Sequence, residues 1–214
     1  MALFRLSHPP APPGVGEPCL RNRLPRHDCQ ACVAACPVQA ITATASTPSI
    51  DEGECLQCGR CLFACPTDAL QNIRPETRRF TGTTLVAPFS TLEPSVDELL
   101  MWHQEHGIRA VEMEMDKFPG WVRAVAALNI QLRELNAPVW QILPPQQKAI
   151  NAARRHFIKA NEVDVESATA RTGRRARRQA FSTLSEYHLA LDRALCTACG
   201  ACARICGENA LSLR

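Results

Sequence analysis

Cysteine is the residue type in this chain whose chemistry and spacing point most directly to a function. The 214-residue sequence contains twelve cysteines in two blocks, and the 130 residues between the blocks contain none. Thiolates are soft ligands that suit iron–sulfur clusters, copper(I) or zinc. The first block comprises Cys19, Cys29, Cys32, Cys36, Cys55, Cys58, Cys61 and Cys65, and the second comprises Cys196, Cys199, Cys202 and Cys206.

The composition of the chain limits the class of protein and the cellular compartment in which these cysteines can occur. Apolar residues make up 46% of the chain and charged residues 21%, which allows a packed core and excludes a wholly disordered chain. No apolar run reaches the roughly 18 residues of a membrane span. The proline-rich start, residues 1–26, lacks the apolar core of a secretory signal. We therefore expect a cytoplasmic protein without a membrane span, whose reduced thiols serve metal binding or catalysis rather than disulfides.

The spacing of the cysteines favours iron–sulfur clusters over zinc. The run from Cys55 to Pro66 reads Cys-x2-Cys-x2-Cys-x3-Cys-Pro, a spacing that can wrap a loop around one face of a cubane. The run that begins at Cys196 has the same spacing, but Gly207 replaces the proline. Zinc sites usually come as separated Cys-x2-Cys pairs with a long spacer, which both runs fit poorly.

The first block resembles bacterial two-cluster ferredoxins over residues 19–73. In that family two such runs face each other, and the fourth cysteine of each run ligates the cluster of the other run. The partner run, residues 29–37, keeps three cysteines and the proline. Arg26 stands where its first cysteine is expected, and Cys19 lies seven residues further upstream. The two runs form an internal repeat of about 29 residues.

The resemblance implies two [4Fe-4S] clusters in the first block, and the second block adds a third. Cluster 1 would use Cys19, Cys29, Cys32 and Cys65, cluster 2 would use Cys36, Cys55, Cys58 and Cys61, and cluster 3 would use Cys196, Cys199, Cys202 and Cys206. If Cys19 does not reach, the first site would hold a three-iron cluster or a labile fourth iron. Cys206 has no partner run, so it could close its own cluster or reach a first-block cluster, and another subunit could complete the site instead.

The cysteine-free middle of the chain predicts alternating strands and helices. Strands are expected at 83–89, 108–115 and 139–143 from their apolar and β-branched patterns. Helices are expected from 94 to 107 and from 119 to 136, with a further helical stretch at 146–161. A β-α-β-α-β order implies a small parallel sheet with right-handed crossovers.

These elements give an α+β or α/β fold with a ferredoxin-like dicluster domain, an inserted small α/β unit and a C-terminal half-ferredoxin motif. The expected order is a flexible proline-rich N-terminus (1–18), the dicluster domain (19–80), the α/β unit (81–161), a basic linker (162–187) and the C-terminal [4Fe-4S] motif (188–214).

Several weaker signals have a plainer alternative. The arginine-rich stretch at 171–178 could dock an acidic protein, but it also suits a solvated linker, and it lacks the aromatic residues that would favour nucleic acid. His103 and His106 could hold a metal, but a solvent-facing pair is the simpler interpretation. His27 could tune a cluster through a hydrogen bond. Asp116 lies at a strand end but has no catalytic partner beside it.

The sequence therefore predicts an electron-transfer protein or subunit that passes single electrons to or from a larger oxidoreductase. An electron carrier or accessory subunit is expected rather than a stand-alone enzyme. Three alternatives remain open: a factor that assembles or matures clusters for a redox enzyme, an oxidoreductase with a substrate site in the α/β unit, and a zinc-stapled nucleic-acid module.

Overall fold

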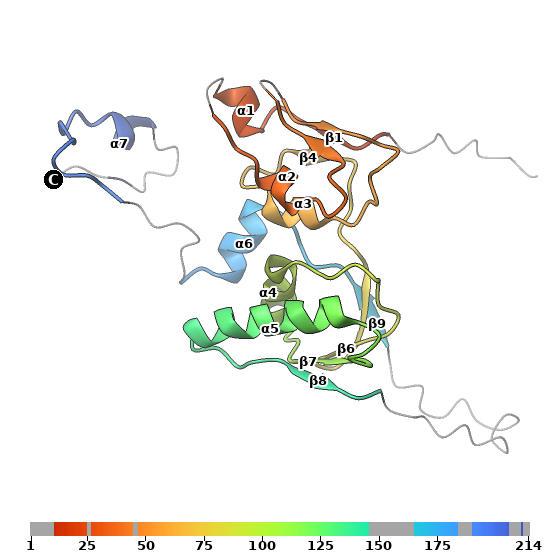
Figure 1. Cartoon of the computed structure of the whole chain (residues 1–214). Coiled ribbons are helices and arrows are strands. Elements are labelled where there is room, and N and C mark those ends of the chain that lie inside the picture. The colour runs from red at the N-terminus through yellow and green to blue at the C-terminus, as the bar shows by residue number, and fades with distance from the viewer. Residues whose placement is uncertain are drawn as a thin grey trace, which may run out of the picture. The chain divides into compact units, whose positions relative to one another are not determined.

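The structure is a computed structural model that describes residues 11–24, 27–44, 47–145, 165–183, 190–205 and 211. The chain forms two compact units, residues 1–181 and residues 182–214 (Figure 1). No helix in the described part of the chain is both long and apolar enough to cross a membrane.

The first block of cysteines lies in a segment of short elements. Two strand pairs are antiparallel, β1 with β4 and β2 with β3, and the helices α2 and α3 each begin inside a cysteine run. The elements are β1 (Gly14–Val15), α1 (Leu20–Arg23), α2 (Ala31–Ala35), β2 (Ile41–Thr42), β3 (Ser49–Ile50), α3 (Arg60–Ala64) and β4 (Leu70–Gln71). Because α2 and α3 pack against each other, the two halves of the repeat are brought together.

The middle of the chain contributes to a five-stranded mixed sheet. The strand order is β8-β7-β6-β5-β9, with β6, β7 and β8 parallel and β5 antiparallel to both of its neighbours. Helix α4 connects β6 to β7, and α5 connects β7 to β8 (Figure 1). The elements are β5 (Arg78–Thr81), β6 (Thr84–Val86), α4 (Val96–Glu105), β7 (Ala110–Glu112), α5 (Pro119–Glu134), β8 (Gln141–Leu143) and β9 (Glu166–Ala168).

This sheet is larger than the three-stranded parallel sheet expected from the sequence. Strands β5 and β9 add an antiparallel pair, and β9 lies in the segment 162–187 that was expected to be a linker. Helix α6 (Arg174–Ala180) lies in the same segment. β9 is only three residues long and mostly exposed, so its sequence has no apolar pattern that would indicate a strand. The helix expected at 146–161 lies outside the described residues.

Local sequence signals account for the two long helices. The Ser95 hydroxyl accepts a hydrogen bond from the backbone N–H of Glu98 at 3.2 Å, as a helix cap does. Pro119 occupies the first turn of α5, where its missing N–H costs nothing. Both helices bury an apolar face, and Trp102 and Trp121 are fully buried.

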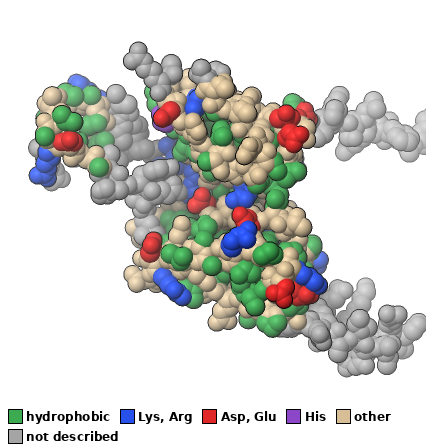
Figure 2. All heavy atoms as spheres, viewed as in Figure 1, with side chains coloured by type: hydrophobic (Ala, Val, Ile, Leu, Met, Phe, Trp, Pro, Cys, Tyr) green, Lys and Arg blue, Asp and Glu red, His purple; other side chains and the backbone are tan. Residues whose placement is uncertain are grey.

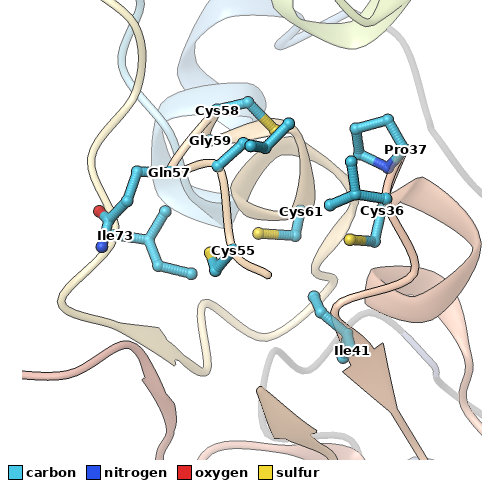
Figure 3. A pocket seen from close by; sticks show the side chains of 11 residues that line it. Cys36, Pro37, Ile41, Cys55, Gln57, Cys58, Gly59, Cys61 and Ile73 are labelled. Carbon is cyan, nitrogen blue, oxygen red and sulfur yellow. The ribbon is translucent and has the colours of Figure 1, made fainter. Parts of the chain in front are cut away.

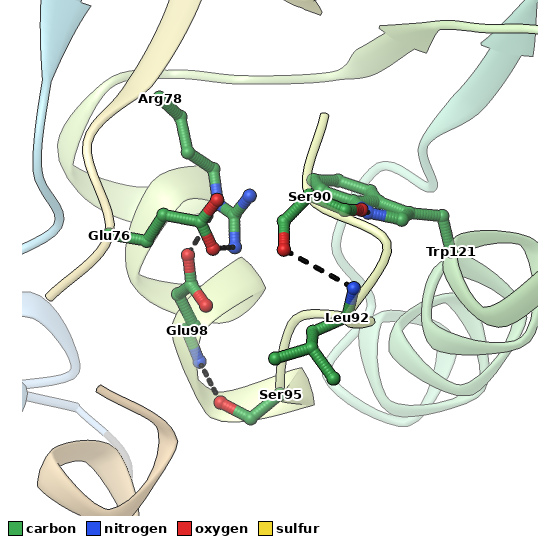
Figure 4. A network of polar contacts seen from close by, with 7 residues as sticks. All are labelled: Glu76, Arg78, Ser90, Leu92, Ser95, Glu98 and Trp121. Carbon is green, nitrogen blue, oxygen red and sulfur yellow. Dashed lines mark hydrogen bonds and ion pairs between the residues drawn. The ribbon is translucent and has the colours of Figure 1, made fainter. Parts of the chain in front are cut away.

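A buried ion pair joins β5 to α4 inside this core. Arg78 donates from Nε to Glu98 Oε1 at 2.5 Å, and a second nitrogen contacts Glu76 at 3.2 Å (Figure 4). The Arg78 guanidinium also lies 4.7 Å from the ring centre of Trp121. Arg78 and Glu98 are 4% and 2% exposed, so removing one partner would leave an uncompensated buried charge.

One apolar core connects the cysteine-bearing segment with the sheet and its helices. Phe63 lies on α3 between two cysteines, is 3% exposed, and packs in the same core as Trp102, Leu128 and Ala176. On the face shown in Figure 2, apolar, acidic and basic side chains of the described residues are interspersed. The core therefore ties the position of α3 to the packing of α4 and α6.

Candidate metal centres

Four cysteines from both runs surround one cavity in the first unit. Cys36 comes from the first run, and Cys55, Cys58 and Cys61 come from the second (Figure 3). The other side chains around it are mostly apolar, among them Ile41. The structure therefore brings together the four thiols that the ferredoxin resemblance assigns to cluster 2.

The loop that carries these thiols is shaped by its backbone. The Asp51 carboxylate accepts hydrogen bonds from the N–H groups of Gly53 and Glu54 at 2.9 and 3.3 Å, and the Cys55 N–H donates to the Asp51 carbonyl at 3.0 Å. Gly59 adopts a φ of +73° just before α3. A side chain there would also meet the Arg74 carbonyl oxygen at 2.8 Å, so only glycine fits.

A second cavity is surrounded by Cys19, Cys29, Cys32 and Cys65. Cys19 reaches it because β1 pairs with β4, the strand that follows Cys65. The Gly16 N–H donates to the Ala69 carbonyl at 2.7 Å and continues this pairing. Cys19 is 8% exposed and packs with Cys65 and Ala69. A short strand pair thus brings the displaced cysteine into the set that the resemblance assigns to cluster 1.

Hydrogen bonds hold the loops around this second cavity. The Cys29 N–H donates to His27 Nδ1 at 3.0 Å, and Arg21 Nε donates to the Cys29 carbonyl at 2.7 Å. The Ala69 N–H donates to the Cys65 sulfur at 3.3 Å, a contact that orients this sulfur at the cavity. Arg21 and Asp51 are therefore part of the two sites although sequence reasoning did not select them. For Asp51 a signal exists, an aspartate four residues before the first cysteine of a run.

The thiols of the two cavities influence one another. The pKa of Cys61 is raised to about 12, first by burial and then by the negative charges that Cys58, Cys55 and Cys32 would carry. The pKa of Cys32 is also raised, first by burial and then by Cys65. Without a positively charged group these thiols stay protonated, so binding of a metal centre must release their protons. Cys32 lies on α2 and Cys61 on α3, and these helices pack against each other, so the two cavities are adjacent.

The donor set fits a cluster in each cavity. Each has four thiols and walls that are otherwise largely apolar, which suits soft iron–sulfur centres. Four thiolates around one zinc ion would stand about 2.3 Å from it. Among the described residues, no three histidine, cysteine or acidic side chains are arranged to hold a single metal ion. All eleven described cysteines are free thiols.

The second unit repeats the loop of the Cys55 run. The Asp192 carboxylate accepts from the Ala194 N–H at 2.9 Å, and the Cys196 N–H donates to the Asp192 carbonyl at 3.0 Å, as Asp51 does for Cys55. Gly200 has a φ of +73°, the value of Gly59. Helix α7 (Ala201–Ile205) follows it as α3 follows Gly59.

The three described thiols of the second unit are accessible to solvent. Cys196, Cys199 and Cys202 are all exposed. Hydrogen bonds from the Ala201 N–H and the Thr197 hydroxyl lower the pKa of Cys199. This thiol is therefore a readier ligand than the buried Cys61 before any metal is bound. Cys206, the fourth expected ligand of cluster 3, lies outside the described residues.

The weaker candidates do not form a further metal or catalytic site among the described residues. The solvent-facing interpretation of His103 was wrong: His103 is 4% exposed and accepts a hydrogen bond from Trp140 Nε1 at 3.0 Å. Burial, followed by the charge of Arg109, lowers its pKa to about 4. His106 packs on the ring of Trp102 at 4.4 Å. Asp116 is exposed in the turn after β7.

Comparisons with known proteins agree with these sites. The family described as 4Fe-4S dicluster domain matches residues 26–69, and the 4Fe-4S binding domain matches residues 189–212. The "Putative oxidoreductase UacF" of Escherichia coli (strain K12) is 36% identical over 61 residues, which are 28% of this chain and 10% of that protein. The chain thus spans only a small part of this relative. No solved structure matches the chain.

The matched segments include every cysteine of both blocks except Cys19, which lies upstream of residue 26. Together with the relative, they support an iron–sulfur electron-transfer role. The chain therefore contains a 4Fe-4S domain of the ferredoxin type and, near its C-terminus, an additional 4Fe-4S motif.

Proposed function

We propose that this protein is an electron carrier or accessory subunit that holds three [4Fe-4S] clusters and passes single electrons to or from a larger oxidoreductase. The observation that carries the proposal is the pair of adjacent four-thiol cavities, each built from both cysteine runs. Two cavities with the same donor set suit two centres of one kind.

The proposed ligands follow from the lining of each cavity. Cluster 1 takes Cys19, Cys29, Cys32 and Cys65, and cluster 2 takes Cys36, Cys55, Cys58 and Cys61. In this arrangement the fourth cysteine of each run serves the other site, as in two-cluster ferredoxins. The interleaving makes the two sites depend on each other, since α2 and α3 must pack together before either set of thiols is complete.

The chain's own residues make these sites suitable for electron transfer. When bound, a [4Fe-4S] cluster supplies one-electron chemistry whose potential depends on burial, charge and hydrogen bonds to sulfur. The apolar lining, which includes Ile41 and Ile73 at one cavity and Val15 and Leu70 at the other, excludes water. The Ala69 N–H donates to the Cys65 sulfur, and hydrogen bonds to the sulfurs are among the features that set a cluster's potential. Cys32 of one site and Cys61 of the other lie on α2 and α3, which pack against each other.

Two observations support a third site in the second unit. The Asp192 loop and the positive φ of Gly200 reproduce the backbone that holds Cys55, Cys58 and Cys61 in the first unit. The hydrogen bonds that lower the pKa of Cys199 prepare this thiol for a metal. We propose Cys196, Cys199, Cys202 and Cys206 as its ligands.

The size of the relative supports the proposal that this chain works together with a larger oxidoreductase. A segment of this kind makes up only about a tenth of a protein whose name describes an oxidoreductase. We infer that the present chain supplies the electron-carrying part to a separate redox partner protein.

Electron counting tests this proposed function. The anaerobically purified protein should take up about three electrons per chain from dithionite, one for each cluster. It should return them to an oxidised viologen or ferricyanide with full recovery of the starting spectrum. A Cys196→Ala variant should lose one of the three electrons and keep the other two. Irreversible bleaching on the first reduction, in protein that carries iron, would contradict an electron-transfer role.

The exposure of the second unit's thiols favours one second candidate, the delivery of a cluster to another protein. Cys196, Cys199 and Cys202 are all open to solvent. A delivery site should lose its iron to a chelator or to a cluster-free acceptor protein within one incubation, while the first unit keeps its iron. Retention of the C-terminal iron through repeated redox cycles in the presence of the acceptor would rule out delivery.

A further inference from the structure

Helix α6 places an arginine directly behind a cysteine of the first unit. Arg177 is 7% exposed, although it lies in the arginine-rich stretch for which the sequence suggested an exposed role, as a docking surface or a solvated linker. Its Nη2 donates to the Cys65 carbonyl at 3.0 Å, and its Nη1 donates to the Phe63 carbonyl at 3.2 Å. Both carbonyls belong to the end of α3, where the last backbone acceptors of a helix attract a positive charge.

Contacts of the residues that precede Arg177 in the sequence set its position on α6. At the start, the Asp68 carboxylate accepts the Arg174 N–H at 2.9 Å with each oxygen. Gly173 has a φ of +101°, and a side chain there would lie 3.1 Å from the Asp68 carboxylate. Further along, Ala176 packs in the core beside α4. The sheet and its helices thus hold the guanidinium against the cysteine-bearing segment.

We propose that Arg177 sets the reduction potential of cluster 1, the centre held by Cys19, Cys29, Cys32 and Cys65. This inference rests on the proposed function. One-electron reduction, by dithionite in the assay below, adds one negative charge to the site and breaks no bond. A buried positive charge at the backbone of a ligand stabilises that added charge, because the attraction is weakly screened away from water. Arg177 therefore makes cluster 1 easier to reduce than it would be without this charge.

Other charged groups near cluster 1 are more open to solvent. Asp68 is exposed, so water screens its negative charge. Arg21 contacts the Cys29 carbonyl at 2.7 Å but is half-buried, and its other bond, to Thr44, lies at the exposed surface. Arg177 is the buried one of these three and should have the largest effect. Arg177 does not bind the cluster. It is a positioning residue, which holds a positive charge at the backbone of the ligand Cys65.

Redox titration of the full-length protein tests the inference. EPR-monitored midpoint potentials are measured for the wild type, for Arg177→Met, and for Arg175→Met, which removes an exposed charge from the same helix. The cluster 1 signal is assigned with Cys19→Ser, which alters only that site. Arg177→Met should disfavour reduction of cluster 1 about tenfold, or about 59 mV for one electron. Arg175→Met and cluster 2 should change little, and Arg177→Lys should restore most of the potential.

Iron content and the midpoint separate the possible outcomes. If Arg177→Met does not retain iron, Arg177→Gln replaces it, because the amide keeps one donor for a carbonyl and carries no charge. An unchanged cluster 1 midpoint in an iron-loaded neutral variant would overturn the inference. So would an equal change in both clusters, which would indicate a general structural effect. A wild type without reversible cluster reduction would refute the proposed function itself, which is a different result from a failure confined to Arg177.

Discussion

Substituting Gly59 by alanine should damage one cluster site far more than an equivalent change elsewhere in the fold. Gly59 has a φ of +73°, and an added Cβ would lie 2.8 Å from the Arg74 carbonyl oxygen and 3.0 Å from the Pro75 Cα. Both are backbone atoms that cannot swing aside. The left-handed conformation costs an alanine about 1 kcal/mol, and the forced backbone shift adds about 2 kcal/mol. The expected loss of stability is therefore about 3 kcal/mol.

Gly82→Ala is the matched control. Gly82 turns the chain between β5 and β6 with a φ of +55°, but an added Cβ would meet no atom within 4 Å. It should cost only the conformational part, about 1 kcal/mol. The difference in the free energy of unfolding between the two variants therefore measures the cost of the contact with Arg74 and Pro75.

The assay combines urea unfolding with iron analysis under anaerobic conditions. Gly59→Ala should bind up to about four irons fewer per chain, because the loop holding Cys58 and Cys61 can no longer close. Gly82→Ala should bind as much iron as the wild type. Equal destabilisation of the two variants, with full iron in Gly59→Ala, would refute the role given to this turn.

Three further predictions concern the other parts of the chain. Cys19→Ala should leave about three irons in one site, seen as a three-iron EPR signal in the oxidised protein; an unchanged spectrum would exclude Cys19 as a ligand. Asp192→Ala removes the acceptor for the Ala194 N–H and should make the C-terminal iron the first to be lost to a chelator; equal loss rates in variant and wild type would contradict this. The pKa of His103 is lowered to about 4, so the unfolded chain binds the extra proton. The free energy of unfolding should be constant above about pH 6.5 and fall by at most about 3 kcal/mol towards pH 4. In His103→Gln this part of the pH dependence should disappear from urea-unfolding curves, and its persistence would refute the assignment.

The grouping of the thiols around each cavity could be predicted from the sequence because ligand spacing is a local property. The spacing in the runs around Cys55 and Cys196 indicates a cluster site at each run. The ferredoxin resemblance assigned Cys36 and Cys65, the last cysteine of each run, to the cluster of the other run. How Cys19 reaches its cavity could not be predicted, because its position depends on the pairing of two-residue strands, β1 with β4. Such short strands carry no periodic pattern.

Residues that depend on long-range packing were also missed. Arg177 lies in a stretch whose composition resembles a linker, and only the packing of Ala176 and Phe63 in one core shows that it is buried. His103 was misplaced for the same reason, because its partner Trp140 lies 37 residues away in the sequence. Burial of a polar side chain by a distant element leaves no local signal in the sequence.

The metal and sulfide content of the anaerobically purified full-length protein tests the central claim most directly. Three [4Fe-4S] clusters predict about twelve irons and about twelve acid-labile sulfides per chain, with a spectrum that bleaches reversibly on reduction. Zinc bound in place of iron, or iron without labile sulfide, would contradict the claim.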